Sequence, residues 1–336
     1  MGSFGSAGSS VPVPIASVAK VMTGYVTLRE HPLGAGQAGF AMTVTAAQVA
    51  EQRQRLGVGQ STLPVRAGEQ ISERQALQAL LLPSANNVAA MLATHDASSV
   101  AAFVARMNTT ARALGMSSTT YTDPSGYDAT TVSTAADQLR LARAAMRMPA
   151  FAAIVDERSA ELPVAGTVEN LDGLLGEDGY VGVKTGSDRA AGGCFMFAKH
   201  ITVGSLELTV LGVVLGQREG SLIGAALASA RRLGDSAAAS VRLLTVLPAR
   251  TRVLTATSAD GRHATVVTKG ALRELGWGGL TLPVNVAASR VVTSRLRAGQ
   301  RLATVTVDGV GAPSTAAVAR QSLGGPSLGW RLAHLL

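Results

Sequence analysis

The fold of this chain is decided by residues 14–30, which read PIASVAKVMTGYVTLRE. The stretch is mostly apolar and lies between two prolines, so it predicts a helix over Ile15–Arg29. Within it, Ser17 and Lys20 are three residues apart, which places them one turn apart on the same helix face. A serine hydroxyl is a poor nucleophile at neutral pH and needs an adjacent base. The pair therefore predicts a serine nucleophile with a lysine as its base.

Two further motifs follow in the chain, Ser84-Ala85-Asn86 and Lys184-Thr185-Gly186. A lysine acts as a base only if burial or a second cation lowers its pKa, and Lys184 supplies a second positive charge. Ser84 is expected to relay a proton between the two ammonium groups and the leaving amine. Asn86 carries an amide that can hold a substrate carbonyl and hydrogen-bond Lys20. Few lysines are available for such roles, because only four occur among thirty basic residues: Lys20, Lys184, Lys199 and Lys269.

The Lys184-Thr185-Gly186 motif ends the run 179–183, GYVGV, which predicts a strand. A glycine there lets a substrate backbone approach closely, and such a strand can bind a peptide by adding it to the sheet. Taken singly, each motif has an ordinary explanation, such as a surface helix or a helix cap. The order S-x-x-K, S-x-N, K-T-G is typical of penicillin-binding proteins and serine β-lactamases. It predicts a serine acyl-transfer enzyme.

The residues around the motifs extend this likeness to one family. The chain resembles the low-molecular-mass penicillin-binding proteins, the serine-type D-alanyl-D-alanine carboxypeptidases, strongly over about residues 12–235 and more weakly over 240–336. After the first helix, the resemblance is carried by AGEQISERQALQALLLPSANNVAAMLA, FVARMNTTARALGMSSTTYTDPSGYD, STAADQLRLARAAM, VGVKTGSDRAAGGCFMFA and, near the end, AGQRLATVTVDG.

The resemblance implies a role for each matching residue. Ser17 is expected to be acylated, its backbone N–H forming an oxyanion hole with that of Ser187. Thr185 is expected to help hold the substrate's terminal carboxylate, and Arg218 is the nearest candidate for the arginine that many relatives use there. The implied catalytic residues are Ser17, Lys20, Ser84, Asn86 and Lys184, and the implied substrate-binding residues are Thr185, Gly186, Ser187 and Arg218.

The implied fold is α+β. Residues 1–237 are expected to form a transpeptidase fold of the penicillin-binding and β-lactamase type, an antiparallel sheet with flanking helices and a helical subdomain. After Ala237 the chain turns to short runs rich in valine and threonine, separated by turn residues. These runs predict a separate all-β, sandwich-like domain over 238–336.

The resemblance implies an enzyme that removes the terminal D-alanine of peptidoglycan stem peptides through a Ser17 acyl-enzyme and is inhibited by β-lactams. It also implies a location in the cell envelope or outside the cell. A D,D-endopeptidase uses the same motifs and stays open. A serine β-lactamase needs a base for deacylation, for which Glu157, Glu161 and Glu169 lie in the right interval without the expected local pattern. A third alternative is a catalytically weak protein that binds the cell wall.

Several residues depart from the family pattern. Asp188 stands where a threonine or serine is usual and brings a negative charge near the carboxylate site, unless it pairs with Arg189 or Lys184. Asn87 replaces the usual aspartate after the S-x-N motif. The opening MGSFGSAGSS has neither a charged nor an apolar region, so no signal peptide is predicted, and the family's first strand is incomplete.

Composition adds limits on partners. A chain of 336 residues that is 47% hydrophobic and 15% charged is predicted to be globular rather than disordered. The net charge of +8 favours anionic surroundings such as cell-wall polymers or lipid headgroups, so peripheral association with either stays open. Basic residues are scattered without interleaved aromatics, which disfavours nucleic acid. Five histidines show no metal-ligand spacing, so no metal or cofactor is predicted.

Overall fold

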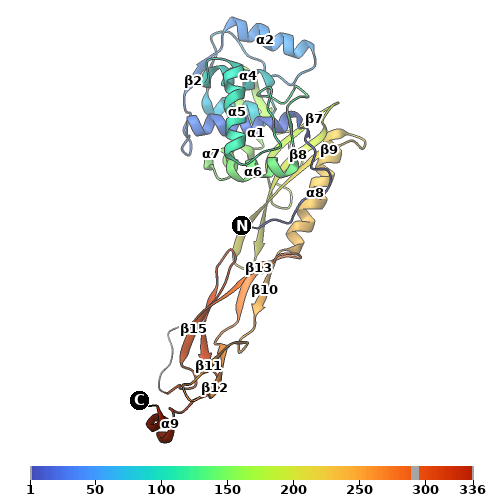
Figure 1. The fold of residues 1–336 in the computed structure, drawn as a ribbon. Helices are drawn as coiled ribbons and strands as arrows, with labels where there is room; N and C mark the ends of the chain where they lie inside the picture. Colours follow the sequence, from blue (N-terminus) through green and yellow to red (C-terminus); the bar gives the residue numbers. More distant parts are fainter. Residues whose placement is uncertain (1, 289–294, 335–336) are drawn as a thin grey trace. The chain divides into compact units, whose positions relative to one another are not determined.

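The computed structural model describes residues 2–288 and 295–334 and falls into two compact units (Figure 1). One unit comprises Ser6–Thr202 and Leu206–Ala238, and carries all the predicted motifs. The other comprises Val203–Ser205 and Ala239–Leu336, together with the residues before Ser6. We propose domains at 1–237 and 238–336, with their boundary inside the helix that ends the first unit.

The first unit contains most of the helices. The helix predicted over Ile15–Arg29 is confirmed, except that its first turn is a 3-10 turn, η1 (Ala16–Ala19), which continues directly into α1 (Lys20–Glu30). Ala16 has a positive φ of 45°, which is not α-helical and accounts for the irregular start. The other helices of this unit are α2 (Ala46–Gly57), α3 (Glu73–Leu81), α4 (Asn86–Asp96), α5 (Val100–Ala113), α6 (Ala135–Ala145), α7 (Pro149–Val155) and α8 (Leu222–Ser240).

The central sheet of this unit has three strands. Strands β7 (Tyr180–Asp188), β8 (Gly192–Val203) and β9 (Leu206–Gln217) lie in chain order, and β7 runs antiparallel to β8. Because β7 occupies one edge of this sheet, the K-T-G motif lies on an edge strand. Three short strand pairs complete the unit: β1 (Val13–Pro14) with β4 (Val132–Ser133), β2 (Ala41–Thr43) with β3 (Gln70–Ser72), and β5 (Ser159–Leu162) with β6 (Gly166–Glu169).

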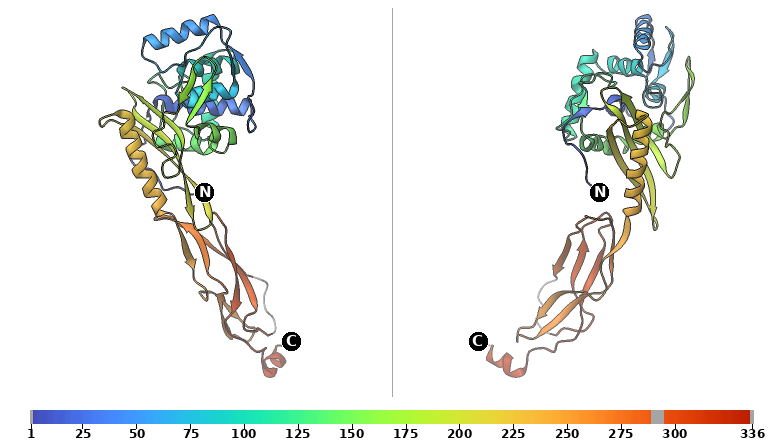
Figure 2. Two further views of the ribbon diagram at one scale, coloured as in Figure 1. Left: turned by 180° about the vertical axis from the view of Figure 1, so that it is seen from behind. Right: turned by 90° about the vertical axis from the view of Figure 1, so that its right-hand side faces the viewer.

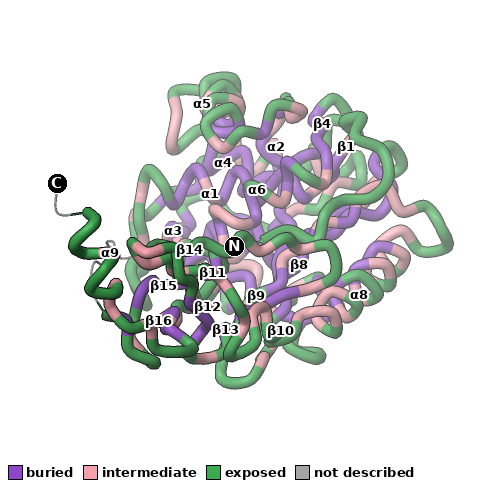
Figure 3. The backbone as a smooth tube through the Cα atoms, turned by 60° about the horizontal axis from the view of Figure 1, so that its bottom comes forward, coloured by how far each residue is buried: buried purple, intermediate pink, exposed green. Residues whose placement is uncertain are grey.

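The sheet separates two hydrophobic clusters. On one face, Tyr180, Phe195 and Phe197 pack with Ala226 and Ala230 of α8, which lies along the sheet in Figure 2. The other face contributes its apolar side chains to the larger core that surrounds α1. Helix α1 is buried along most of its length (Figure 3), as expected for a helix that is apolar on nearly all sides. The residues at its beginning are therefore held firmly in place.

The second unit is built of strands. Five form one sheet in the order β11 (Arg252–Thr257), β12 (His263–Thr268), β16 (Ser314–Ala319), β15 (Arg301–Val307) and β14 (Val284–Ala288). Strands β10 (Arg242–Leu247) and β13 (Leu272–Gly276) form a second sheet, and both sheets contribute to one small core. The short helix α9 (Leu328–Ala333) follows. The α+β architecture with a following β domain is thus confirmed.

No single helix among the described residues is long and apolar enough to cross a membrane. Helices α4 and α5 together meet the requirements of length and composition, with a bend of 88° between them.

Candidate active site

Ser17 and Lys20 meet where η1 passes into α1. The amine of Lys20 lies 2.8 Å from the Ser17 hydroxyl and 2.9 Å from the backbone carbonyl of Ser125. Lys20 is completely buried. Its pKa is lowered well below the ordinary value, first by burial and then by repulsion from Lys184. A neutral amine at hydrogen-bond distance from a hydroxyl has the geometry required of a general base.

The backbone is strained directly before Ser17 and at Ser84, which are two of the predicted catalytic residues. Ala16, which precedes Ser17, has φ of 45°, and Ser84 has φ of 68°. Non-glycine residues adopt this region at a cost of about 1–3 kcal/mol and keep it only where the surrounding structure enforces it. Such strain is common at active sites, and here it fixes the direction in which each serine leaves the backbone.

Gly186 brings the edge strand against the nucleophile. A methyl group added at Gly186 would lie 2.8 Å from the backbone nitrogen of Ser17 and 3.0 Å from that of Val18. Glycine is therefore required for β7 to approach η1 this closely. The approach explains how two motifs separated by more than 160 residues come to lie side by side.

Lys184 is buried on the same strand, and its amine donates to the carbonyl of Thr185 at 3.0 Å. Burial lowers the pKa of Lys184 to about 7, and the nearby carboxylate of Asp172 partly opposes this effect. Burial also raises the pKa of Asp172 to about 6, although a hydrogen bond from the Leu174 amide and the charge of Lys184 act against the rise. Asp172 thus belongs to the electrostatic surroundings of the site, and sequence reasoning missed it because no motif marks it.

Ser84 and Asn86 lie at the start of α4 with unused hydrogen-bonding capacity. The Ser84 hydroxyl and the Asn86 amide oxygen are buried and have no hydrogen-bond partner among the described residues. The Asn86 amide nitrogen donates to the Gln60 side chain at 2.9 Å, which fixes the amide. Asn87, which replaces the usual aspartate, exchanges two hydrogen bonds with the backbone of Leu63. Buried polar groups without partners are costly, so the two free oxygens are suited to meeting a substrate.

The loop that contains Pro124, Ser125 and Gly126 packs against η1 and the first turn of α1. No role was assigned to this loop from the sequence. The carbonyls of Pro124 and Ser125 accept hydrogen bonds from Thr23 and Lys20 of α1. Gly126 packs so closely that an added methyl group would lie 1.8 Å from the carbonyl oxygen of Ala16. The sequence DPSG of this loop lies in one of the stretches that carry the family resemblance, but nothing in it indicated contact with Lys20.

The remaining predicted residues lie at or after the end of β7. Thr185 and Ser187 pair with Phe195 and Gly193 of β8. The guanidinium group of Arg218 donates to the backbone carbonyls of the β7–β8 turn, at 3.2 Å to residue 189 and 2.6 Å to residue 190. Arg218 therefore lies just beyond the K-T-G strand, where it braces the turn.

Asp188 also supports this turn. Its carboxylate accepts a hydrogen bond from the Ala191 amide at 2.6 Å. In the described part of the chain it forms no ion pair with Lys184 or Arg189, so neither of the pairings considered from the sequence is present. The negatively charged carboxylate of Asp188 therefore faces the backbone N–H of Ala191.

Comparison with known proteins agrees with this geometry. The family model for peptidase S11, described as D-alanyl-D-alanine carboxypeptidase, matches residues 6–218. A D-alanyl-D-alanine carboxypeptidase of Mycobacterium tuberculosis is 37% identical over 196 residues, 56% of this chain and 63% of that protein. A D-alanyl-D-alanine endopeptidase of Pseudomonas aeruginosa is 39% identical over 138 residues, 41% of each chain. The match thus spans less than two thirds of either relative.

Solved structures share the fold. The DD-transpeptidase of Streptomyces K15 superposes with a TM-score of 0.58 and 28% identity, over 67% of this chain and 88% of that one. Penicillin-binding protein 5 of Haemophilus influenzae superposes over 96% of this chain and 93% of that one, with a TM-score of 0.64. At 20% identity, this second likeness concerns the fold alone.

Proposed function

Because the chain belongs to the D-alanyl-D-alanine carboxypeptidase family of serine peptidases, we propose that it removes the terminal D-alanine from peptidoglycan stem peptides that end in D-Ala-D-Ala. The observation that carries the proposal is the 2.8 Å contact between the buried Lys20 amine and the Ser17 hydroxyl. The close approach of Gly186 to the Ser17 backbone adds a peptide-binding edge strand beside that hydroxyl.

In the proposed reaction, the Ser17 hydroxyl oxygen attacks the carbonyl carbon of the penultimate D-alanine while the Lys20 amine takes the hydroxyl proton. The backbone N–H groups of Ser17 and Ser187 stabilise the negative oxygen of the tetrahedral intermediate. The peptide bond then breaks, and the leaving D-alanine receives a proton through Ser84. Water hydrolyses the resulting ester and restores the free serine.

Substrate binding follows from the edge position of β7. A stem peptide added along β7 places its terminal carboxylate near Lys184 and Thr185, with Arg218 beyond the strand end. The unpaired amide oxygen of Asn86 is available for a substrate N–H. A β-lactam carries a carboxylate and a reactive amide in a similar arrangement, so we expect Ser17 to open its ring and form a penicilloyl ester.

Endopeptidase action on cross-links is the second candidate, because the Pseudomonas aeruginosa relative bears that name and the chemistry at Ser17 is the same. A β-lactamase is less well supported. Glu157 binds the side chains of Arg74 and Gln78, and Glu161 accepts the Thr167 hydroxyl. These contacts occupy the two carboxylates in structural roles. Glu169 is exposed, and no hydrogen bond or ion pair among the described residues links it to Ser17.

We also propose an extracytoplasmic location, since peptidoglycan lies outside the cytoplasm. The net charge of +8 is suited to anionic cell-wall polymers and lipid headgroups, so peripheral association with the wall or the membrane is part of the proposal.

The proposal is tested by incubating the protein with a diacylated L-Lys-D-Ala-D-Ala peptide and measuring released D-alanine. We expect release by the wild type and none by Ser17→Ala, with the L-Ala-L-Ala peptide as the substrate control. Cleavage restricted to cross-linked peptides would favour the endopeptidase. Turnover of penicillin within seconds would favour the β-lactamase. Binding of peptidoglycan without any cleavage would favour the catalytically weak alternative.

We expect a bell-shaped dependence of kcat/KM on pH, because the reaction needs Lys20 neutral and Lys184 charged. Burial and repulsion from Lys184 lower the pKa of Lys20, and protonation of Lys20 produces the acid limb. Deprotonation of Lys184 produces the alkaline limb, near pH 7 in the free enzyme. Asp172 raises the pKa of Lys184, so Asp172→Asn should move the alkaline limb to lower pH.

The matched control for this shift is Asp178→Asn, which neutralises an exposed aspartate and should leave both limbs in place. An alkaline limb that stays unchanged in Asp172→Asn would contradict the assignment of that limb to Lys184.

A further inference from the structure

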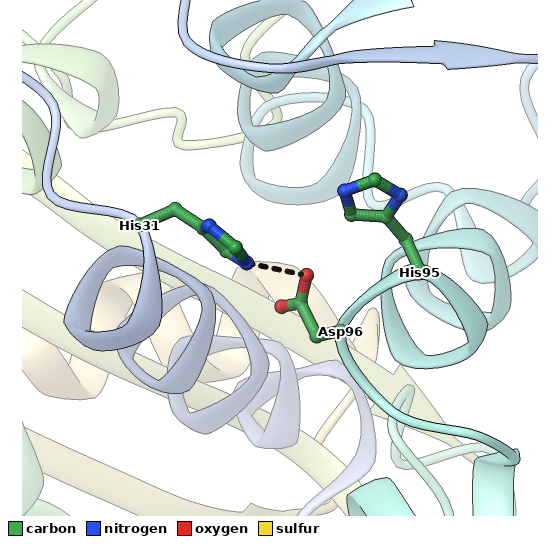
Figure 4. A group of neighbouring side chains, drawn as sticks. All are labelled: His31, His95 and Asp96. Carbon is green, nitrogen blue, oxygen red and sulfur yellow. Dashed lines mark ion pairs between the residues drawn. The ribbon is translucent and has the colours of Figure 1, made fainter.

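The two helices that carry the first two motifs also end beside one another. His31 follows the last residue of α1, and His95 and Asp96 are the last residues of α4. Each helix has 11 residues, so these ends lie about 16 Å along the helix axis from Lys20 and Asn86. Figure 4 shows the imidazole of His31 turned toward the Asp96 carboxylate. This cluster is separate from the candidate active site.

The three side chains converge on a small volume. One possible ligand atom from each of His31, His95 and Asp96 lies within 4.8 Å of the other two. The closest measured pair is the His31 Nε2 and Asp96 Oδ1 atoms, at 3.4 Å. Two imidazoles and one carboxylate are a common set of ligands for divalent transition metals.

Asp96 has one oxygen fixed by a hydrogen bond and the other facing His31. Its side chain is completely buried, and its Oδ2 atom accepts a hydrogen bond from the Thr27 hydroxyl at 2.7 Å. Its Oδ1 atom, which lies 3.4 Å from His31 Nε2, accepts no hydrogen bond from the part of the chain that the structure describes. A carboxylate that is oriented through one oxygen and free of hydrogen bonds at the other is arranged as metal-binding carboxylates are. A buried oxygen without a hydrogen bond also calls for an explanation.

Phe40 holds both imidazole rings. It stacks on His95 at a centroid distance of 4.0 Å and meets His31 edge-on at 4.9 Å. These two contacts place the imidazoles of His31 and His95 around one phenyl ring, at the C-terminal ends of α1 and α4.

A second carboxyl group lies near the cluster. Glu73 is a second buried carboxylate, and its Oε1 atom has no partner. Burial raises the pKa of Glu73 to about 7, and the charge of Asp96 adds to the rise, so the two carboxyl groups are within electrostatic reach of one another. Among residues 2–288 and 295–334, neither pairs with a lysine or an arginine. In that part of the chain, the only ion pair of either carboxyl group is the one between Asp96 and His31, and a divalent cation bound there would favour the charged form of both carboxyl groups.

We propose that His31, His95 and Asp96 bind a divalent first-row transition-metal ion of the zinc type, with the fourth position open to water. In a tetrahedral zinc site the ligand atoms are about 3.3 Å apart, so the present spacings of up to 4.8 Å have to contract by up to about 1.5 Å. The exposed side chain of His95 can make that movement by sliding over the ring of Phe40. A pocket of about 210 Å³, lined by Met42, Gln48, Met91 and His95, gives the ion and its water access to this histidine.

The bound ion joins the ends of α1 and α4 and so stabilises the helices that hold Ser17, Lys20 and Asn86. Its role is structural, because the site lies a full helix length from the reacting groups. The proposal does not depend on the proposed function, and its test requires no catalysis.

The test uses the full chain without an affinity tag, freed of metal by a chelator. We expect it to bind one equivalent of Co²⁺, seen as a visible absorption band, and to gain about 5–10 °C in Tm when Zn²⁺ is present at about 100 times Kd. His95→Ala removes an exposed ligand and should weaken binding of both ions at least tenfold. His200→Ala removes an exposed histidine on β8 and should bind as the wild type does.

Equal affinity of His95→Ala and the wild type would overturn the proposal. Failure of the wild type to bind Co²⁺ or to gain stability with Zn²⁺ would overturn it as well. His95 is exposed, so its variant should fold, and Tm in the chelator alone checks this directly.

Discussion

Lys20→Ala is expected to lower the rate of penicillin acylation at least about a thousandfold, because nucleophile and base act as a unit and loss of either is severe. The amine that lies 2.8 Å from the Ser17 hydroxyl is completely buried, and no other lysine or arginine among the described residues hydrogen-bonds that hydroxyl. The measurement is the second-order rate constant for labelling by a fluorescent penicillin. Near-UV circular dichroism establishes that the variant is folded.

Lys199→Ala is the matched control for this variant. Lys199 is also a buried lysine of the same unit, but it pairs with Asp235 at 2.5 Å and lies over the ring of Tyr180. Its loss should reduce stability and leave the acylation rate of the folded protein within a few fold of the wild type. A Lys20→Ala protein that acylates within tenfold of the wild type would remove Lys20 from the mechanism.

Gly186→Ala is expected to lower acylation about a hundredfold, because the added methyl group lies 2.8 Å from the Ser17 nitrogen and 3.0 Å from the Val18 nitrogen. Both neighbours are backbone atoms of the nucleophile turn, so either η1 or β7 has to move. Misplacement of a reacting group by about 1 Å can cost a factor of this size. The same labelling assay measures the effect.

Gly57→Ala is the control for Gly186→Ala, since a methyl group at Gly57 meets nothing within 4 Å and its φ is negative. It should leave acylation unchanged. If Gly186→Ala labels as fast as Gly57→Ala, the close approach of β7 to η1 has no importance for the reaction.

The features that could be predicted from the sequence depend on residues that lie close together in the chain. Ser17 and Lys20 lie one helical turn apart, so their contact follows from helix geometry, and the apolar stretch around them predicts a buried helix. The strand that carries Lys184 was recognisable from its β-branched run. The α+β fold and the family followed from the order of the three motifs and from the resemblance of the surrounding stretches.

The features that could not be predicted depend on contacts between segments that lie far apart in the chain. The carbonyl of Ser125 reaches Lys20 across 105 residues, and the Asn86 amide is held by Gln60 from a loop that carries no motif. Asp172 acts on Lys184 through burial and charge rather than through a pattern. The five histidines show no local metal-ligand spacing in the sequence, and His31 and His95 come together only where α1 and α4 pack against one another.

Asp188 shows that the contacts of a residue that departs from a family pattern depend on the surrounding fold. Its carboxylate was expected to act on the substrate's carboxylate or on a neighbouring cation. In the structure it accepts the Ala191 amide within the β7–β8 turn, which depends on the fold of the turn and not on the motif that precedes it.

The central claim is that Ser17 is the nucleophile, and the most direct measurement is mass mapping of the peptide that a penicillin modifies. The wild type should gain one penicilloyl group on the peptide that contains Ser17, and Ser17→Ala should gain none. Undiminished labelling of Ser17→Ala, or an adduct that maps to Ser84 or to any other residue, would contradict the assignment of the active site.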